Sequence, residues 1–133
     1  MAINFKDKVY ILDGAMGTML QRSGMSADET STHFGQNNPD ILKGIHKQYI
    51  DAGASHVIVT SYIFHDGLLD MERLHKLVHT VGKDKLVIDL SCRKRDDKWF
   101  VVTDKWTKFS DFEVNAQSIR MIEQYCDELL IHA

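Results

Sequence analysis

Two short apolar runs of this sequence each lead directly into a carboxylic acid. Residues 86–88 precede Asp89, and residues 9–12 precede Asp13. Runs rich in branched side chains are typical of strands buried in a parallel sheet. In such sheets the reactive groups collect where the carboxyl ends of the strands meet the loops. Asp89 is therefore the first candidate for acid–base chemistry.

Glycine and hydroxyl groups accompany these acids. Asp13 opens a loop in which Gly14 and Gly17 let the backbone turn sharply or approach a ligand closely. A third apolar run ends in the hydroxyls of Thr60 and Ser61. Taken alone, aspartates in such places are more often turn or cap residues, and the two hydroxyls could cap the next helix. The residue types by themselves leave both interpretations open.

The thiol and imidazole side chains do not form a metal signature. The two cysteines, Cys92 and Cys126, have neither the paired spacing of a zinc site nor the pattern of a disulfide scaffold. His75 and His79 have the spacing of a metal pair on a helix, but no motif supplies a third ligand. We expect no metal and no cofactor, and the cysteine usage favours a reducing cytoplasm.

The composition is that of a soluble globular protein. The chain has 133 residues, a hydrophobic fraction of 44% and a formal net charge of −3. Nucleic acid and anionic membranes attract basic surfaces, which this charge does not indicate. No apolar run approaches the roughly 20 residues that cross a bilayer, and the N-terminus lacks the apolar core of a signal peptide. We expect a cytoplasmic protein without nucleic-acid or membrane partners.

Strand-like and helix-like segments alternate along the chain. The expected helices are 16–22, 39–52, 68–81 and about 113–126, and the expected strands are 9–12, 56–61, 85–93 and 129–132. Residues 23–38 show little periodicity and are expected to form a long loop. A strand or hairpin around residues 99–106 interrupts the alternation. The order of the remaining elements predicts parallel βα units.

The predicted fold class is α/β, in one domain over residues 1–133. Its parallel βα units are of the kind found in (β/α)₈ barrels, with about four parallel strands and an inserted β-hairpin, which is about half of a complete barrel. Four strands cannot close a barrel, so the chain is expected to form a half-barrel or a flavodoxin-like open sheet. The open sheet edges could pair with a second copy, which makes a homodimer one expected assembly.

Two segments carry a pattern that is specific to one family. They are residues 11–21 (ILDGAMGTMLQ) and 38–49 (NPDILKGIHKQY). Over about residues 9–54, the chain resembles the start of the homocysteine-binding barrel of methionine synthase. This resemblance implies that Asp13, Gly14, Ala15, Met16, Gly17 and Thr18 would cradle the amino-acid part of homocysteine. The cysteines that hold zinc in that family have no counterpart here, so methyl transfer is the weaker expectation.

Four other segments carry a different and highly specific pattern. They are residues 54–62 (ASHVIVTSY), 87–94 (VIDLSCRK), 98–106 (KWFVVTDKW) and 130–133 (LIHA). From about residue 51 to 133, the chain resembles the eukaryotic-type phosphoribosylformimino-aminoimidazole-carboxamide ribotide isomerase of histidine biosynthesis. Both families are (β/α)₈ barrels, and the two patterns meet at residues 51–54. We therefore expect a recombined or engineered chimera, with residues 1–53 methyltransferase-like and 54–133 isomerase-like; a natural fusion or a gene-model artefact is the alternative.

The isomerase resemblance implies an Amadori rearrangement, which needs a carboxylic acid and a carboxylate on opposite sides of the substrate. Asp89 matches the general acid of the family, whereas the partner aspartate belongs to a segment that this chain lacks. Asp13 has the right chemical type and is a stand-in, at roughly 10 Å from Asp89 if two strand spacings separate them. Thr60 and Ser61 match a phosphate-binding strand end, where hydroxyl and backbone N–H groups can hold phosphate oxygens.

These observations predict a half-barrel scaffold that retains parts of a sugar-phosphate isomerase site but no efficient complete one. One alternative is a residual aldose–ketose isomerase or phosphate-binding protein, with a phosphate or sugar phosphate as its small-molecule partner. A weaker alternative is a homocysteine-binding methyltransferase fragment. Asp89 and Asp13 are the catalytic candidates of the isomerase interpretation, and Thr60 and Ser61 are its phosphate-binding candidates.

Overall fold

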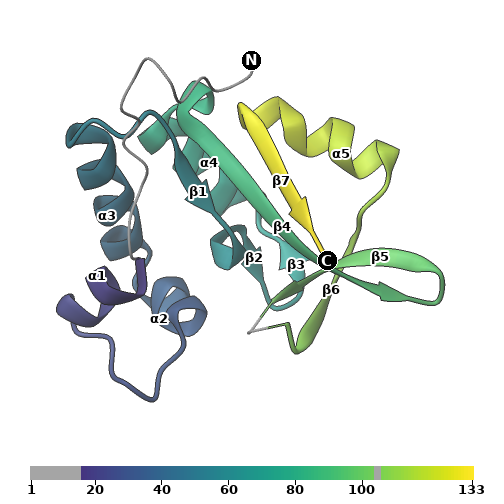
Figure 1. Ribbon diagram of the computed structural model, residues 1–133, viewed down its shortest axis with the longest axis horizontal. Coiled ribbons are helices and arrows are strands. Elements are labelled where there is room, and N and C mark those ends of the chain that lie inside the picture. Colours follow the sequence, from purple (N-terminus) through teal and green to yellow (C-terminus); the bar gives the residue numbers. More distant parts are fainter. Residues whose placement is uncertain (1–15, 104–105) are drawn as a thin grey trace, which may run out of the picture.

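Three parallel strands form the centre of the molecule. The computed structural model describes residues 16–103 and 106–133. Strands β1 (Val57–Val59), β4 (Leu86–Arg95) and β7 (Glu128–His132) run parallel in the order β1-β4-β7, as Figure 1 shows. The parallel sheet confirms the predicted fold class, and it is not closed into a barrel. The strand predicted at residues 9–12 lies outside the described residues.

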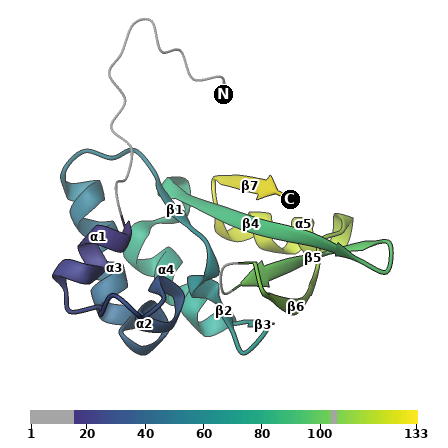
Figure 2. The same cartoon turned by 60° about the horizontal axis from the view of Figure 1, so that its bottom comes forward.

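Helices α4 (Met71–Val81) and α5 (Ala116–Ile122) cover one face of this sheet, as Figure 2 shows. Alternate residues of β4 point toward them, and Ile88 and Leu90 on that side are fully buried with Leu77 of α4 and Ile122 of α5. Removing such side chains from water is the main favourable term in folding. The sheet is therefore held by a core on its helical side.

The opposite face of the sheet is more open. Ile58 of β1 and Leu130 of β7 are 41% and 45% exposed. Because side chains alternate along a strand, Asp89 and Ser91 of β4 project to this same side. In a closed (β/α)₈ barrel the strand face away from the helices is the interior, so this open face corresponds to a barrel interior that lies partly exposed.

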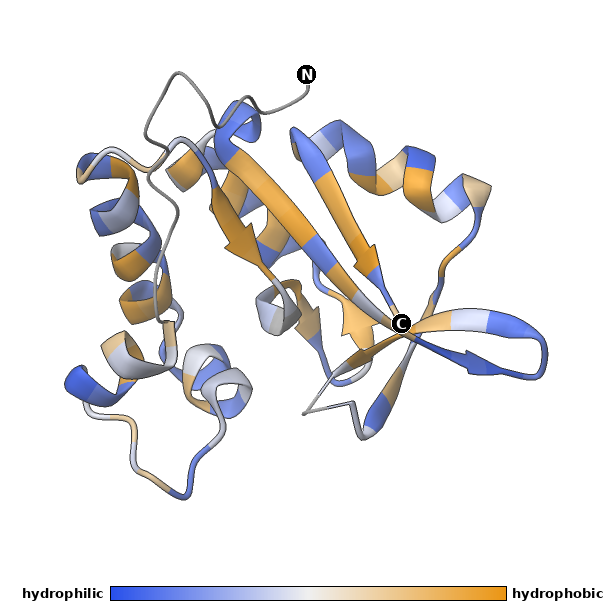
Figure 3. Cartoon of the chain, viewed as in Figure 1, coloured by the Kyte–Doolittle hydropathy of each residue, from blue (hydrophilic) through white to orange (hydrophobic). Residues whose placement is uncertain are grey.

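The second half of β4 leaves the parallel sheet and enters an antiparallel one. Residues 92–95 pair with β5 (Lys98–Thr103), which pairs in turn with β6 (Lys108–Glu113). Asp96 and Asp97 connect β4 to β5 with φ angles of 50° and 62°, as a two-residue turn between twisted strands requires. Figure 3 shows the change along β4, which is hydrophobic in its first half and hydrophilic at its far end.

The inserted hairpin was predicted, but its extent was not. It is a three-stranded antiparallel unit because β4 itself continues into it and β6 follows it. The helix expected from about residue 113 begins only at Ala116, since residues 108–113 are strand. Asn115 accepts hydrogen bonds from the backbone N–H groups of Gln117 and Ser118, so it caps α5. The 3-10 segment η3 (Glu123–Tyr125) continues α5 toward β7.

Two more elements differ from their predictions. Residues 23–38, expected as a loop, contain α2 (Ser31–Asn37), whose first turn is capped by the Thr30 hydroxyl. Leu68 and Leu69 form the short strand β3 (Leu68–Leu69), which pairs with β2 (Phe64–His65), and so they do not begin the expected helix. That helix, α4, starts after Asp70 because the Asp70 carboxylate caps it.

The remaining helices agree with prediction. Helix α1 (Met16–Arg22) has the expected bounds, and α3 (Pro39–Asp51) begins at the single proline, which suits the first turn of a helix. Short 3-10 segments η1 (Ser61–Ile63) and η2 (Lys83–Lys85) follow β1 and precede β4. Within the described ranges, no helix combines the length and apolar character needed to cross a bilayer.

Candidate acid site at the end of the parallel sheet

Asp89 lies on β4 between Ile88 and Leu90, which are both buried, and its side chain projects to the open face of the sheet. Its side chain is 11% exposed. The burial of the flanking Ile88 and Leu90 against the helices fixes the orientation of the strand, and alternation then places Asp89 on the other side. The predicted candidate acid is thus held rigidly by the central strand, which is the most extensively paired strand of the sheet.

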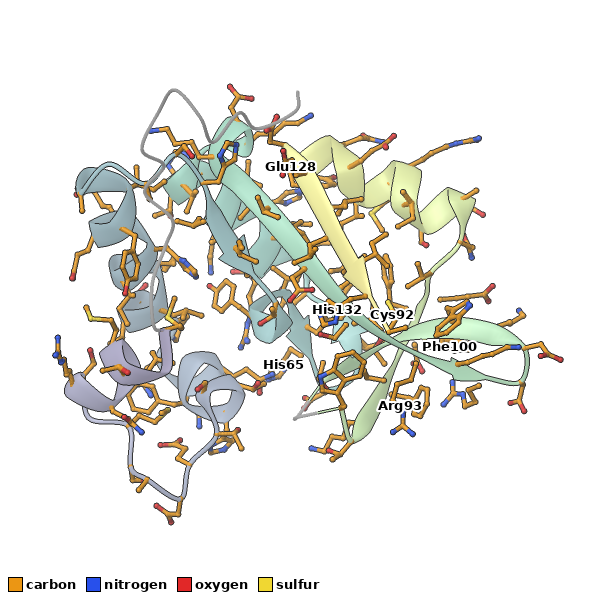
Figure 4. The ribbon with its side chains drawn as sticks, viewed as in Figure 1. His65, Cys92, Arg93, Phe100, Glu128 and His132 are labelled. Carbon is orange, nitrogen blue, oxygen red and sulfur yellow. The ribbon has the colours of Figure 1, made fainter. Side chains whose placement is uncertain are left out.

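His132 is the side chain that meets Asp89. Its Nε2 atom lies 2.9 Å from Oδ1 of Asp89 and 3.3 Å from Oγ of Ser91. The parallel register pairs Ser91 with His132 and Asp89 with Leu130. His132 therefore stands beside Ser91, two residue pairs beyond Asp89, and its side chain reaches back toward Asp89. Figure 4 shows His132 at the end of β7.

The environment of Asp89 favours its protonated form. Burial raises the pKa of the Asp89 carboxyl group, and the nearby His132 opposes this effect without cancelling it. Oδ1 is buried, and no hydrogen bond of good geometry reaches it from the described residues, so its contact with His132 is electrostatic. A carboxyl group that stays protonated to higher pH is suited to donate a proton. This agrees with the general-acid role that the isomerase resemblance implies for Asp89.

The two thiols are poor nucleophiles and poor metal ligands in this structure. Burial raises the pKa of Cys92, and the Asp89 charge raises it further; burial also raises the pKa of Cys126. Both side chains are buried, and their Sγ atoms donate to the carbonyl groups of Leu90 and Ile122 at 3.2 and 3.8 Å. The reactive form of cysteine is the thiolate. Across residues 16–103 and 106–133, no group of three or more potential ligands could hold a metal ion.

A cavity of about 230 Å³ lies at the carboxyl end of β7, where His132 is part of its lining. Its lining is mostly apolar and includes Cys92, Trp99, Ile131 and His132. The Trp106 ring lies 5.1 Å from the His132 ring, at an interplanar angle of 56°. The β4–β5–β6 unit brings Trp99 and Trp106 near His132, because it folds back beside the end of β7.

Thr60 and Ser61, the two predicted phosphate-binding residues, are not among the residues that contact Asp89. Thr60 is exposed directly after β1 and lines a second cavity of about 220 Å³, and Ser61 begins η1. The lining includes hydroxyl groups and His46 but no lysine or arginine. A dianionic phosphate is usually held by cations or by several backbone N–H groups. The alternative that Thr60 caps the next α-helix is wrong, because Asp70 caps α4.

The predicted homocysteine loop is described only at its end. Asp13, Gly14 and Ala15 lie outside the described residues, so the distance from Asp13 to Asp89 stays a prediction. Met16 and Gly17 begin α1, and Thr18 is exposed on it. Met16 also lines the 220 Å³ cavity together with Thr60. The described part of the loop therefore lies beside the end of β1.

His132 is the functional candidate that the residue pattern missed. The sequence marked it as part of the last strand and of the segment 130–133 that resembles the isomerase family, without a role of its own. Its position beside Ser91 follows from the pairing of β4 with β7, which no motif states directly. The signal that could have found it is the expected adjacency of consecutive βα units, since parallel strands place their carboxyl ends side by side.

The known proteins to which this chain is similar fall into two groups. A family model described as homocysteine S-methyltransferase matches residues 10–95. The chain belongs to the homocysteine S-methyltransferase family. This match includes residues 13–18 and extends through β1 and β4. It is therefore longer than the methyltransferase-like segment predicted from the sequence motifs, residues 9–54.

The curated relatives carry another name, 1-(5-phosphoribosyl)-5-((5-phosphoribosylamino)methylideneamino) imidazole-4-carboxamide isomerase, here called the ribotide isomerase. The protein of Medicago truncatula, described as chloroplastic, is 54% identical over 84 residues, or 63% of this chain and 27% of the relative. Those of Yarrowia lipolytica and Eremothecium gossypii are 39% and 35% identical over 95% and 94% of this chain, and 52% and 51% of their own lengths.

This methyltransferase-family chain therefore spans about half the length, or less, of these relatives. The likeness to ribotide isomerases supports an isomerase-related ancestry, and both likenesses include β1 and β4. Neither comparison locates a boundary at residues 51–54. One relative is described as chloroplastic, so the expected cytoplasmic location stays a prediction.

Proposed function

We propose that this chain is a half-barrel scaffold of ribotide-isomerase ancestry that keeps the acid of the isomerase site without an efficient complete site. The observation that supports this proposal is the setting of Asp89. It is the one Asp or Glu side chain, among the described residues, at the carboxyl ends of the parallel strands β1, β4 and β7. A raised pKa suits it to donate a proton.

An Amadori rearrangement needs two carboxyl groups in different protonation states. One donates a proton to the ring oxygen of the aminoaldose, and the other removes a proton from carbon. His132 contacts Asp89 at 2.9 Å and so lies on the same side of a substrate as the acid. It does not replace a base on the opposite side, and the described part of the chain offers no other candidate there. Efficient turnover by this chain alone is therefore not expected.

An assay of the purified chain with the ribotide named for its relatives tests the proposal. The expected result is no turnover above the buffer rate, with identical traces for the wild type and Asp89→Asn. Asp84→Asn, which removes an exposed carboxylate in η2, is the matched control. Turnover that Asp89→Asn abolishes and Asp84→Asn preserves would overturn the proposal and establish the alternative, a residual isomerase.

Sugar-phosphate binding without turnover is the second candidate function. The open hydroxyl of Thr60 at the 220 Å³ cavity favours it, whereas the lack of a cation in the cavity lining weighs against tight binding. Titration with ribose 5-phosphate, followed by calorimetry, tests it. Saturable binding at millimolar concentration that Thr60→Ala weakens supports this candidate, and the absence of saturation removes it.

Homocysteine binding is the third and weaker candidate. The family match and the place of Met16 at the same cavity favour it, whereas the buried thiols Cys92 and Cys126 provide no zinc-thiolate site. Titration with homocysteine in the presence and absence of Zn²⁺ decides this point. Affinity that rises on addition of Zn²⁺ would support the candidate, and an identical weak response in both titrations would exclude it.

A chimeric origin is the final part of the proposal. Both a methyltransferase match and a likeness to ribotide isomerases occur in this one chain, which is consistent with βα units drawn from two families. Sequencing of the transcript tests whether the chain is a real product. A continuous reading frame through codons 51–54 is expected, and an interruption there would identify a gene-model artefact.

A further inference from the structure

The cavity of about 220 Å³ lies between the first three helices and the end of β1. Helices α1, α2 and α3 pack on one another, and α3 also contacts β1 (Figure 1). We propose that this cavity binds a small uncharged molecule with an apolar body and one hydroxyl or amide group, which forms a hydrogen bond with His46. This inference goes beyond the proposed function, because it assigns the cavity a ligand that is neither a phosphate nor an amino acid.

His46 has a hydrogen-bonding atom without a partner. The residue comes from α3 and is 2% exposed. Its Nδ1 atom is buried, and no described residue forms a hydrogen bond with it. Buried polar groups nearly always have a partner, because an unpaired one has lost its hydrogen bonds to water. Since His46 forms part of the cavity lining, a molecule that enters the cavity can supply the missing bond.

The charges around the cavity favour an uncharged ligand. Burial lowers the pKa of His46 to about 4, so its imidazole is neutral at pH 7. The residues that line the cavity include no Asp, Glu, Lys or Arg. Arg73 lies 5.7 Å from the centre of the Tyr62 ring, but its guanidinium pairs with Asp70. An ion in this cavity would lose its hydration without gaining a counter-charge, so phosphates and zwitterionic amino acids should bind poorly.

The size and lining of the cavity suit a molecule that is apolar at one end and polar at the other. An apolar cavity of about 150 Å³ is large enough to bind benzene, and this one has a volume of about 220 Å³. Leu20 and Leu42 are buried in its lining, whereas Ser31 and Thr60 are exposed. Ligand pockets typically combine such an apolar lining with a few polar groups that fix orientation. A ligand can therefore enter beside the two hydroxyls and place its apolar part against the leucines.

Three probes of similar shape test this inference with the full chain: benzyl alcohol, toluene and benzoate. In NMR titrations, benzyl alcohol should bind saturably and shift the ring signals of His46, whereas benzoate should not bind. His46→Phe keeps an aromatic ring but removes its hydrogen-bonding atoms. This variant should bind benzyl alcohol about fivefold more weakly, as the loss of one hydrogen bond predicts, without binding toluene more weakly. His79→Phe, at an exposed site on α4, is the matched control and should leave both affinities unchanged.

Each outcome decides the inference. If benzyl alcohol does not saturate at millimolar concentration, the cavity holds water only and the inference is wrong. Equal weakening of benzyl alcohol and toluene in His46→Phe would also overturn it, because the ring would then have a purely structural role. If His46→Phe does not fold, the wild type decides: benzoate that binds as tightly as benzyl alcohol, or His46 ring signals that ignore bound benzyl alcohol, would be contrary results. These titrations need no ribotide, so their failure is distinct from a failure of the proposed function.

Discussion

The carboxylate of Asp70 binds Arg73 in two ways at the start of α4. Oδ1 accepts a hydrogen bond from the backbone N–H of Arg73 at 2.9 Å, and Oδ2 lies 3.3 Å from its Nε. The guanidinium also donates from a terminal nitrogen to the carbonyl of Gln36 at 3.3 Å. The Asp70 cap thus determines where α4 begins, and the Arg73 guanidinium connects α4 to α2.

Asp70→Ala is expected to lower the free energy of unfolding by about 1 kcal/mol, the usual cost of losing a helix N-cap. Urea denaturation followed by circular dichroism measures it. Asp84→Ala, which removes an exposed aspartate from η2, should change stability by less than about 0.5 kcal/mol. Equal losses in the two variants would show that the cap does not stabilise α4.

Asp89→Asn is expected to stabilise the fold near neutral pH. Burial raises the pKa of Asp89 above the ordinary value of 3.8, so its stability contribution is fully present below pH 3.8 and is lost as pH rises through the raised pKa. Asparagine keeps the shape without the charge. The urea midpoint of the variant, relative to that of the wild type, should therefore increase as the pH rises from 3 to 8. A difference that is constant across this range would contradict the prediction.

His46 should make stability depend on pH in the opposite direction. It is 2% exposed on α3, and burial lowers its pKa from 6.5 to about 4. Its stability contribution is therefore present above pH 6.5 and is lost as pH falls toward 4, by on the order of 3 kcal/mol. His46→Phe should remove most of this loss, as measured by urea denaturation at pH 5 and 7. His79→Phe, at an exposed site, should not.

The open face of the sheet is expected to support self-association. Ile58 and Leu130 are 41% and 45% exposed there, and β7 pairs with β4 alone among the described strands. We propose a homodimer formed through this region, because a second copy could cover both the edge and the apolar side chains. Sedimentation should show a mass that rises with concentration, and Leu130→Lys should keep the chain monomeric. A wild-type monomer at all concentrations would exclude the dimer.

The parallel sheet and its helices could be predicted from the sequence, because the spacing of apolar residues indicates which side of a strand or helix is buried. Helices α1 and α3 have almost the predicted bounds, and the apolar run before Asp89 is the central strand. The errors occurred where local chemistry overrides periodicity. Asp70 ends the β2–β3 hairpin and starts α4 among residues that all fit a helical pattern, and Thr30 starts α2 in a stretch without one.

The sequence by itself determined the α/β class and the isomerase-related ancestry, and it singled out Asp89 as the candidate acid, because strand runs and family motifs are properties of consecutive residues. Only the tertiary structure decided the partner of that acid. His132 is separated from Asp89 by the whole β5–β6–α5 segment, and the register of β7 on β4 brings them to 2.9 Å. A shift of one residue in that register would turn His132 to the helical face.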